Sequence, residues 1–62
     1  MHKYYSILRP IGPGTAPGDA VEIVNYDDRT YIDDIGREAW GYLIYREPLE
    51  NPEDYDLMES DQ

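Results

Sequence analysis

A chain of 62 residues without a single cysteine has to hold its fold together by its hydrophobic core. Disulfides and cysteine-based zinc sites, which commonly stabilise proteins of this size, are both excluded. A domain this small buries only about 60% of the surface that its unfolded chain exposes, so we expect marginal stability. The length allows one domain, and a partner or a second copy would supply part of the missing stability.

The acidic composition raises the alternative of a disordered chain, because high net charge with low hydrophobicity is typical of disorder. The chain holds 14 Asp and Glu against 5 Lys and Arg, which gives a formal charge of −9. Seven tyrosines and one tryptophan oppose this interpretation, since disordered chains are poor in aromatic residues. We therefore expect a single ordered domain over residues 1–58 and a frayed acidic tail over 59–62.

Three segments have the residue pattern of β-strands. Residues 3–8 and 41–46 are rich in aromatic and branched side chains, and a proline follows each of them. Residues 20–26 alternate between two faces with the period of two that strands require. The proline- and glycine-rich segment 10–18 predicts a long, constrained loop between the first two strands. The short connection after residue 26 favours antiparallel pairing.

The segment 32–40 has the spacing of a short helix. Its helical stripe would hold Ile32, Ile35, Gly36 and Ala39. Gly36 opposes the helix, because glycine costs up to about 1 kcal/mol in a helix interior. The sequence predicts an α+β fold, in which this helix covers one face of a small three-stranded, mostly antiparallel sheet and Trp40 lies in the core.

A short C-terminal element completes the predicted domain. Asn51 is a suitable helix cap, Pro52 suits the first helical position, and acids follow in the first turn. Tyr55 and Leu57 alternate, however, so a brief strand over 55–58 is the competing prediction. A terminal helix and a terminal strand both remain open.

The residue inventory argues against catalysis, and we expect no enzyme. Nucleophilic catalysis needs a base beside the nucleophile, but the only histidine is His2, at the terminus. The paired acids Asp27-Asp28, Asp33-Asp34 and Glu53-Asp54 lack the spacing of a calcium loop, and a turn and two helix starts explain them. No phosphate-loop motif is present, and Lys3 is the last lysine. We expect neither a metal nor another cofactor.

Charge and hydropathy also restrict the partners and the compartment. A net charge of −9 repels nucleic acid, so we expect no direct binding to it. The N-terminal residues lack the apolar run of a signal peptide, and nowhere are there about 18 consecutive apolar residues. We expect a cytoplasmic protein that does not bind membranes.

Several short motifs resemble a group of small bacterial proteins from gut Firmicutes and their mobile elements. The motifs are Tyr4-Tyr5-Ser6, Arg9-Pro10, Pro13-Gly14-Thr15, Ile23-Val24-Asn25-Tyr26-Asp27, Ala39-Trp40-Gly41-Tyr42, Tyr45, Pro48-Leu49 and Tyr55-Asp56-Leu57. The resemblance covers nearly the whole chain and implies a compact domain in a bacterial or phage setting. It carries over no catalytic residues. It is consistent with accessory modules of mobile elements, some of which are suspected of countering host defence.

The distribution of charge suggests where a partner binds. Residues 1–46 carry a net charge of −2, whereas residues 47–62 carry −7 and contain no base. The candidate contact surface is therefore acidic, and it consists of Glu47, Glu50, Glu53, Asp54 and Asp56. Tyrosine is enriched at protein interfaces, and the candidate aromatic contacts are Tyr5, Tyr26 and Tyr45.

These features predict a non-enzymatic acidic module that binds a basic protein partner. The partner would be a nucleic-acid-binding or host-defence protein, whose basic site the carboxylates occupy in place of phosphates. The simpler explanation is that acidity only confers solubility. The alternative function is a small oligomeric structural or accessory protein that pairs through Tyr-rich strand edges.

Overall fold

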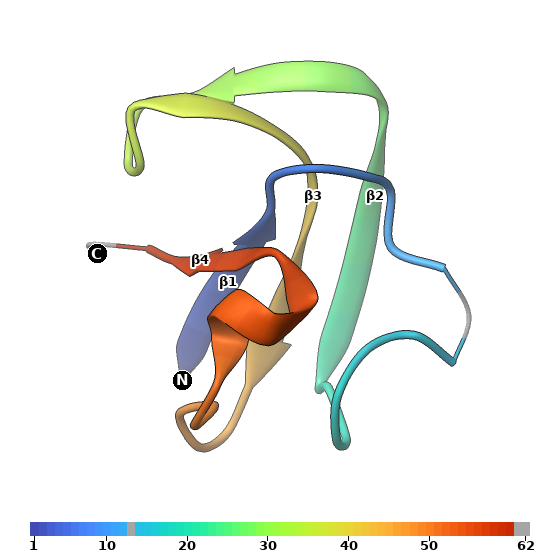
Figure 1. Ribbon diagram of the computed structural model, residues 1–62, viewed down its shortest axis with the longest axis vertical. Helices are drawn as coiled ribbons and strands as arrows, with labels where there is room; N and C mark the ends of the chain where they lie inside the picture. The colour runs from blue at the N-terminus through green and yellow to red at the C-terminus, as the bar shows by residue number, and fades with distance from the viewer. Residues whose placement is uncertain (13, 61–62) are drawn as a thin grey trace.

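The computed structural model describes residues 1–12 and 14–60, which form a four-stranded antiparallel sheet (Figure 1). The strand order across the sheet is β2-β3-β1-β4. Its elements are β1 (His2–Ser6), β2 (Glu22–Ile32), β3 (Arg37–Tyr45), the 3-10 helix η1 (Pro52–Tyr55) and β4 (Leu57–Glu59). The α+β prediction with three strands is therefore wrong, because the described chain holds a fourth strand and no α-helix.

The helix predicted over 32–40 is a β-hairpin. Ile32 ends β2, residues 33–36 form the turn, and β3 begins at Arg37. Gly36 adopts the left-handed conformation (φ 68°), and its amide donates to the carbonyl of Ile32 at 2.9 Å. Glycine reaches this conformation without steric cost, so it closes the turn where a helix would need φ near −60°. The helical stripe was thus a coincidence of spacing across two strands and a turn.

An irregularity inside β2 bends the β2–β3 hairpin. Asn25 pairs with Gly41 and Thr30 pairs with Ala39, so residues 26–29 all lie opposite Trp40. Extra residues in one strand increase its local twist and bend it. The far end of the hairpin accordingly turns across the rest of the sheet (Figure 1). The aspartates at 27 and 28 lie in this bend, within a strand that runs to Ile32.

The hydrophobic core lies on one face of the sheet, where β3 places alternate residues. Ala39, Gly41, Leu43 and Tyr45 are buried, whereas Trp40, Tyr42 and Ile44 between them are half-buried. Tyr4 and Leu43 are fully buried and form the core cluster with Tyr45 and Leu57. Four partly buried residues pack against this cluster from the loops, namely Ile11, Ala16, Ala20 and Leu49. The loops thus supply the second layer that the predicted helix was expected to provide.

Trp40 is not part of this core. Its side chain is half-buried on the opposite face, and the guanidinium carbon of Arg29 lies 5.9 Å from the ring centroid. Because side chains alternate along a strand, Trp40 points away from the face that holds its buried neighbours, Ala39 and Gly41.

The C-terminal element combines the two alternatives. Pro52 begins η1 as expected, but the side chain of Asn51 makes no capping hydrogen bond. Asp56 then adopts φ 57°, and its amide closes the turn on the carbonyls of Glu53 and Pro52. Beyond β4, the Ser60 amide donates to the Lys3 carbonyl at 2.9 Å, and residues 61–62 of the expected tail lie outside the described residues.

Helical structure in the described residues is confined to the single short turn of η1. No helix there has the length and apolar character needed to cross a membrane.

Candidate functional site

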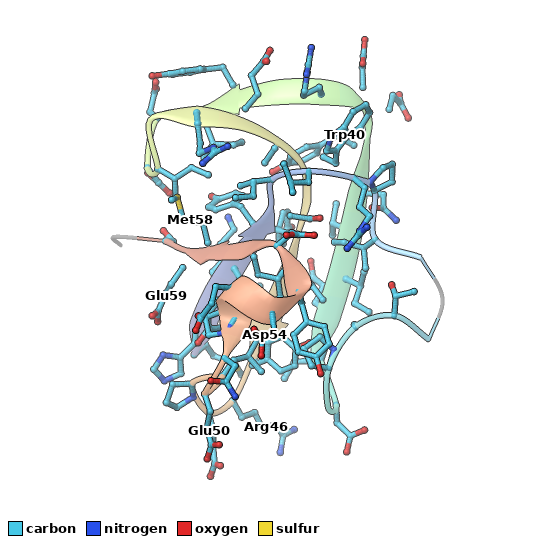
Figure 2. The ribbon with its side chains drawn as sticks, in the orientation of Figure 1. Trp40, Arg46, Glu50, Asp54, Met58 and Glu59 are labelled. Atoms are coloured by element: carbon cyan, nitrogen blue, oxygen red, sulfur yellow. The ribbon has the colours of Figure 1, made fainter. Side chains whose placement is uncertain are left out.

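The acidic residues predicted as a contact surface follow β3 and continue through η1. Glu47 and Glu50 lie in the connection between β3 and η1, and Glu53 and Asp54 lie in η1; all four are exposed. Asp56 is half-buried in the turn that leads into β4. Figure 2 shows Asp54 on η1 and Glu50 below it, in the loop that leads to η1. The structure therefore places these acids along one continuous stretch of surface chain.

An ion pair neutralises Asp56, and Glu59 of β4 lies beside a histidine. Arg9 donates from Nη2 to Asp56 Oδ2 at 2.7 Å, and His2 Nδ1 lies 3.3 Å from Glu59 Oε2. The remaining four, Glu47, Glu50, Glu53 and Asp54, form no ion pair within the described residues. Their charge faces solvent uncompensated, whereas Asp56 is an internal partner of Arg9.

The candidate aromatic contacts are largely internal. Tyr5 is 3% exposed and Tyr45 is 4% exposed. The Tyr5 hydroxyl donates to Asp34 Oδ2 at 3.3 Å, which ties the tip of the β2–β3 hairpin to the centre of the sheet. The Tyr45 hydroxyl donates to the carbonyl of Pro17. Tyr26 is half-buried, so of the three only Tyr26 offers substantial ring surface.

Tyrosines also form a cluster on the face of the sheet opposite the core. Tyr42 lies at its centre, with ring centroids 6.4 Å from Tyr5 and 6.2 Å from Tyr26. Nζ of Lys3 lies 4.3 Å from the Tyr42 centroid and 5.1 Å from the Tyr5 centroid. A hydrogen bond with Tyr5 raises the pKa of Lys3. The Tyr42 hydroxyl donates to Glu22 Oε2 at 3.1 Å, and this hydrogen bond raises the pKa of Tyr42. Period-two alternation in 3–8, 20–26 and 41–46 is the signal that could have identified this cluster.

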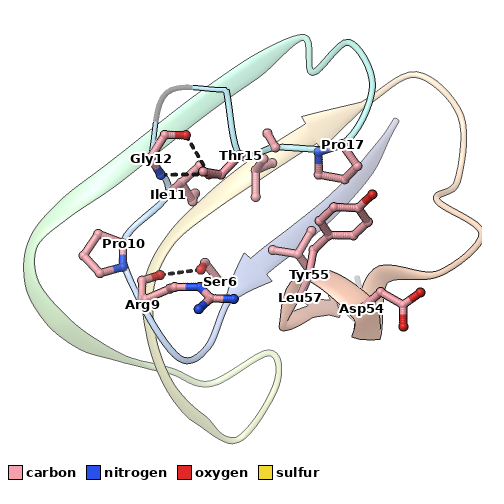
Figure 3. Close-up of a pocket in the computed structure, with 12 residues that line it drawn as sticks. Ser6, Arg9, Pro10, Ile11, Gly12, Thr15, Pro17, Asp54, Tyr55 and Leu57 are labelled. Atoms are coloured by element: carbon pink, nitrogen blue, oxygen red, sulfur yellow. Dashed lines mark hydrogen bonds between the residues drawn. The ribbon is translucent and has the colours of Figure 1, made fainter.

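A groove that the sequence did not reveal lies between the loop after β1 and η1 (Figure 3). It has a volume of about 340 Å³. Its apolar lining consists of Pro10, Ile11, Ala16, Pro17, Leu43 and Leu57. Arg9, Asp54 and Tyr55 add polar groups, and the core residues Leu43 and Leu57 form part of its wall.

The loop wall of this groove is held by side-chain hydrogen bonds. Asn25 clamps the backbone of Ile11, because its Oδ1 accepts from the Ile11 amide at 2.8 Å and its Nδ2 donates to the Ile11 carbonyl at 2.9 Å. Thr15 Oγ1 accepts from the Gly12 amide at 3.1 Å and donates to the Gly12 carbonyl at 2.7 Å. A polar asparagine on an otherwise apolar strand face was the sequence signal for this clamp.

The structure offers little that could hold a metal ion or activate a nucleophile. Within residues 1–12 and 14–60, no group of three or more His, Cys, Asp or Glu residues is arranged to bind a metal. His2 lies beside Glu59, and the hydroxyl of Ser6 donates to the Arg9 carbonyl inside the groove wall.

Comparisons with known proteins identify a family. No curated protein and no solved structure matched the chain. A family model described as "Defence against restriction A C-terminal" matches residues 1–62, which is the whole chain. The chain therefore belongs to the Defence against restriction A C-terminal family, whose name connects it with defence against restriction.

Proposed function

We propose that this domain is a non-enzymatic, acidic protein-binding module that occupies the basic, DNA-contacting site of a restriction protein. A restriction enzyme must hold the phosphate backbone with clustered Lys and Arg, and such a cluster attracts any dense array of negative charge. A module that covers this cluster would keep the enzyme from its DNA. The family name supplies the setting, and the carboxylate surface supplies the chemistry.

The observation that carries this proposal is that four exposed carboxylates within eight residues of chain form no ion pair in the described residues: Glu47, Glu50, Glu53 and Asp54. Internal salt bridges would indicate a structural use, as for Asp56 and Arg9. Unpaired acids repel one another and lower stability, so a surface that concentrates them is suited to a cationic partner. Solubility alone would be served equally well by acids spread over the whole chain.

Electrostatic attraction of this kind has a defined kinetic signature. Opposite net charges accelerate encounter, and salt weakens the effect because the Debye length falls from about 10 Å at 0.1 M to about 3 Å at 1 M. We therefore expect the domain to bind its partner quickly at low ionic strength and slowly at high ionic strength.

Competition with DNA tests the proposal directly. A labelled DNA duplex carrying the recognition site is bound to a purified restriction enzyme, and the domain is titrated in while the anisotropy of the label is measured. We expect displacement of the duplex and protection of plasmid from cleavage. A panel of restriction enzymes of different classes that shows neither displacement nor protection at low salt would contradict the proposal.

A charge-matched pair of triple variants separates the acidic surface from net charge. The test variant carries Glu50→Gln, Glu53→Gln and Asp54→Asn. The control carries Asp19→Asn, Asp27→Asn and Asp33→Asn, which lie elsewhere and are also exposed. Both change the net charge from −9 to −6. We expect the test variant to lose most of the displacement and the control to keep most of it.

Self-association through an open strand edge is a second candidate function. β2 lies at one edge of the sheet and exposes Ile23 and Tyr31. An exposed edge strand is a template for pairing with another chain. Sedimentation velocity tests this alternative, because a monomer at tens of micromolar concentration would exclude it.

A further inference from the structure

We propose that the groove between loop residues 9–12 and 15–17 on one side and η1 on the other is the docking site for an extended basic peptide segment of the partner, which inserts one large apolar side chain. This inference rests on the proposed function, because it names the part of the partner that the acidic surface recognises. It adds a short-range, apolar contact to the long-range attraction of the carboxylates.

The size and lining of the groove indicate an apolar occupant. Ligand pockets have volumes of roughly 300–1,000 Å³, so about 340 Å³ is at the lower end and fits a single large side chain. Two prolines, Pro10 and Pro17, line it from the loop, and Leu57 lines it from β4 (Figure 3). An apolar side chain placed there would remove this surface from water.

Several backbone and hydroxyl groups around the groove are already hydrogen-bonded within the domain. The Ser6 hydroxyl donates to the Arg9 carbonyl, and Thr15 bonds both the amide and the carbonyl of Gly12. A ligand that depended on many hydrogen bonds would find these groups engaged. The guanidinium of Arg9 is neutralised by Asp56 at 2.7 Å, so it does not present a free positive charge to an anion.

The charge left at the groove is negative and selects a cation. Asp54 lines the groove, and Glu53 precedes it in η1; neither forms an ion pair in the described residues. Lys or Arg residues next to the inserted side chain would reach these carboxylates. Charge complementarity therefore favours a basic segment over an acidic or neutral one.

The walls of the groove are formed before binding. Asn25 anchors Ile11 with two hydrogen bonds, and the Tyr45 hydroxyl holds the Pro17 carbonyl. On the other side, the amide of Ile7 donates to the Asp56 carbonyl at 3.1 Å, which ties the end of β1 to the turn after η1. Preformed walls reduce the entropy lost on binding, which favours recognition of a short peptide.

Amide chemical shifts of the labelled domain, recorded with three end-blocked peptides, test the inference. The probes are Lys-Arg-Leu-Lys-Arg, the same peptide with Gly in place of Leu, and Glu-Asp-Leu-Glu-Asp. We expect the first to shift the amides of Gly12, Thr15, Ala16 and Leu57 and to bind at least about tenfold more tightly than the glycine peptide. We expect the acidic peptide to leave these amides unchanged.

Two variants of the domain identify the groove as the place of binding. Ala16→Leu narrows the groove without changing charge, and we expect it to weaken binding of the leucine peptide to the level of the glycine peptide. Asp54→Asn is a second test in case Ala16→Leu fails to fold. It changes only an exposed carboxylate, so we expect this variant to keep the fold. We expect it to weaken binding about two- to fivefold, and Asp19→Asn, the matched control, to have no effect.

The outcomes separate this inference from the proposed function. If the leucine and glycine peptides bind equally and groove amides do not shift, the groove inference is wrong, even if the domain still displaces DNA from a restriction enzyme. If the groove binds the leucine peptide but no restriction enzyme is displaced, the groove inference stands and the proposed function is wrong. Groove shifts that appear with protein concentration alone would make a second copy the occupant and overturn the inference.

Discussion

Gly41 is the residue at which the smallest substitution should have the largest effect on stability. It lies in the central strand β3 and pairs with Ser6 of β1 and Asn25 of β2. A Cβ atom added there would collide with the Val24 carbonyl oxygen and would lie 2.9 Å from Asn25 Cα and 3.2 Å from Asn25 Oδ1. Because two of these atoms are backbone, no side-chain rotation relieves the contact, and β2 would have to move away from β3.

The magnitude follows from the strain and from the clamp that it disturbs. Overpacking a close contact costs typically 1–3 kcal/mol, and displacement of Asn25 also threatens its two hydrogen bonds to Ile11, at about 1 kcal/mol each. We expect Gly41→Ala to lower the free energy of unfolding by about 3 kcal/mol or more. A chain of this length has a free energy of unfolding of about 3–9 kcal/mol, so the variant would lose a third or more of its stability.

Urea denaturation followed by Trp40 fluorescence measures this loss. Gly12→Ala is the matched control, since its added Cβ would meet only Thr15 atoms at 3.5 and 3.6 Å, which is ordinary contact. We expect the control to change the free energy of unfolding by less than about 1 kcal/mol. A Gly41→Ala variant as stable as the control would refute the close approach of β2 and β3 on which this reasoning depends.

Three further predictions follow from single contacts. Asn25→Ala should destabilise the domain by about 1–3 kcal/mol in urea denaturation and increase hydrogen exchange of the Ile11 amide, because two hydrogen bonds are lost; unchanged exchange would contradict the clamp. Burial raises the pKa of Tyr45, and hydrogen bonding raises the pKa of Lys3. Their contribution to stability is therefore complete below the pKa values of the unfolded chain, near pH 10, and is lost as the pH rises through the pKa values of the folded state. The free energy of unfolding of the wild type should fall between about pH 9 and pH 11, and that of Tyr45→Phe should fall less over that range. Trp40→Ala should cost about 1–2 kcal/mol by calorimetry, below the 3–5 kcal/mol of a fully buried tryptophan, since the ring is half-buried; a cost above 3 kcal/mol would place it in the core.

The sequence predicts strands correctly where apolar residues alternate with period two. It does not predict the structure of residues 32–40, which contain two strand ends and a turn. Most of the strand predicted over 20–26 lies in β2, which begins at Glu22, and most of the one over 41–46 lies in β3, because burial on one face imposes that period. Residues 32–40 matched helical spacing only because Gly36 separates two strand ends whose apolar residues fall three or four positions apart. A glycine that opposes a helix in its interior can instead be the residue that closes a hairpin.

The candidate site was predictable in its charge and not in its shape. Glu47, Glu50, Glu53 and Asp54 are exposed, as their polarity requires. Asp56 is half-buried, and its pairing with Arg9 joins residues far apart in sequence and depends on the sheet order. Tyr5 and Tyr45 are buried, on opposite faces of the sheet, because a chain without Phe fills its interior with tyrosine and satisfies each hydroxyl, here with Asp34 and the Pro17 carbonyl. The groove depends on loop residues 9–12 and 15–17 lying against the C-terminal segment, which no local pattern specifies.

The association rate of the domain with a restriction enzyme that it displaces from DNA tests the central claim most directly. Stopped-flow traces are recorded at two ionic strengths for the wild type, the variant with Glu50→Gln, Glu53→Gln and Asp54→Asn, and the charge-matched control. We predict that the test variant associates several-fold more slowly at low salt and loses most of the salt dependence, while the control retains both. Equal association rates for the two variants at both ionic strengths would contradict the claim that this acidic surface directs binding.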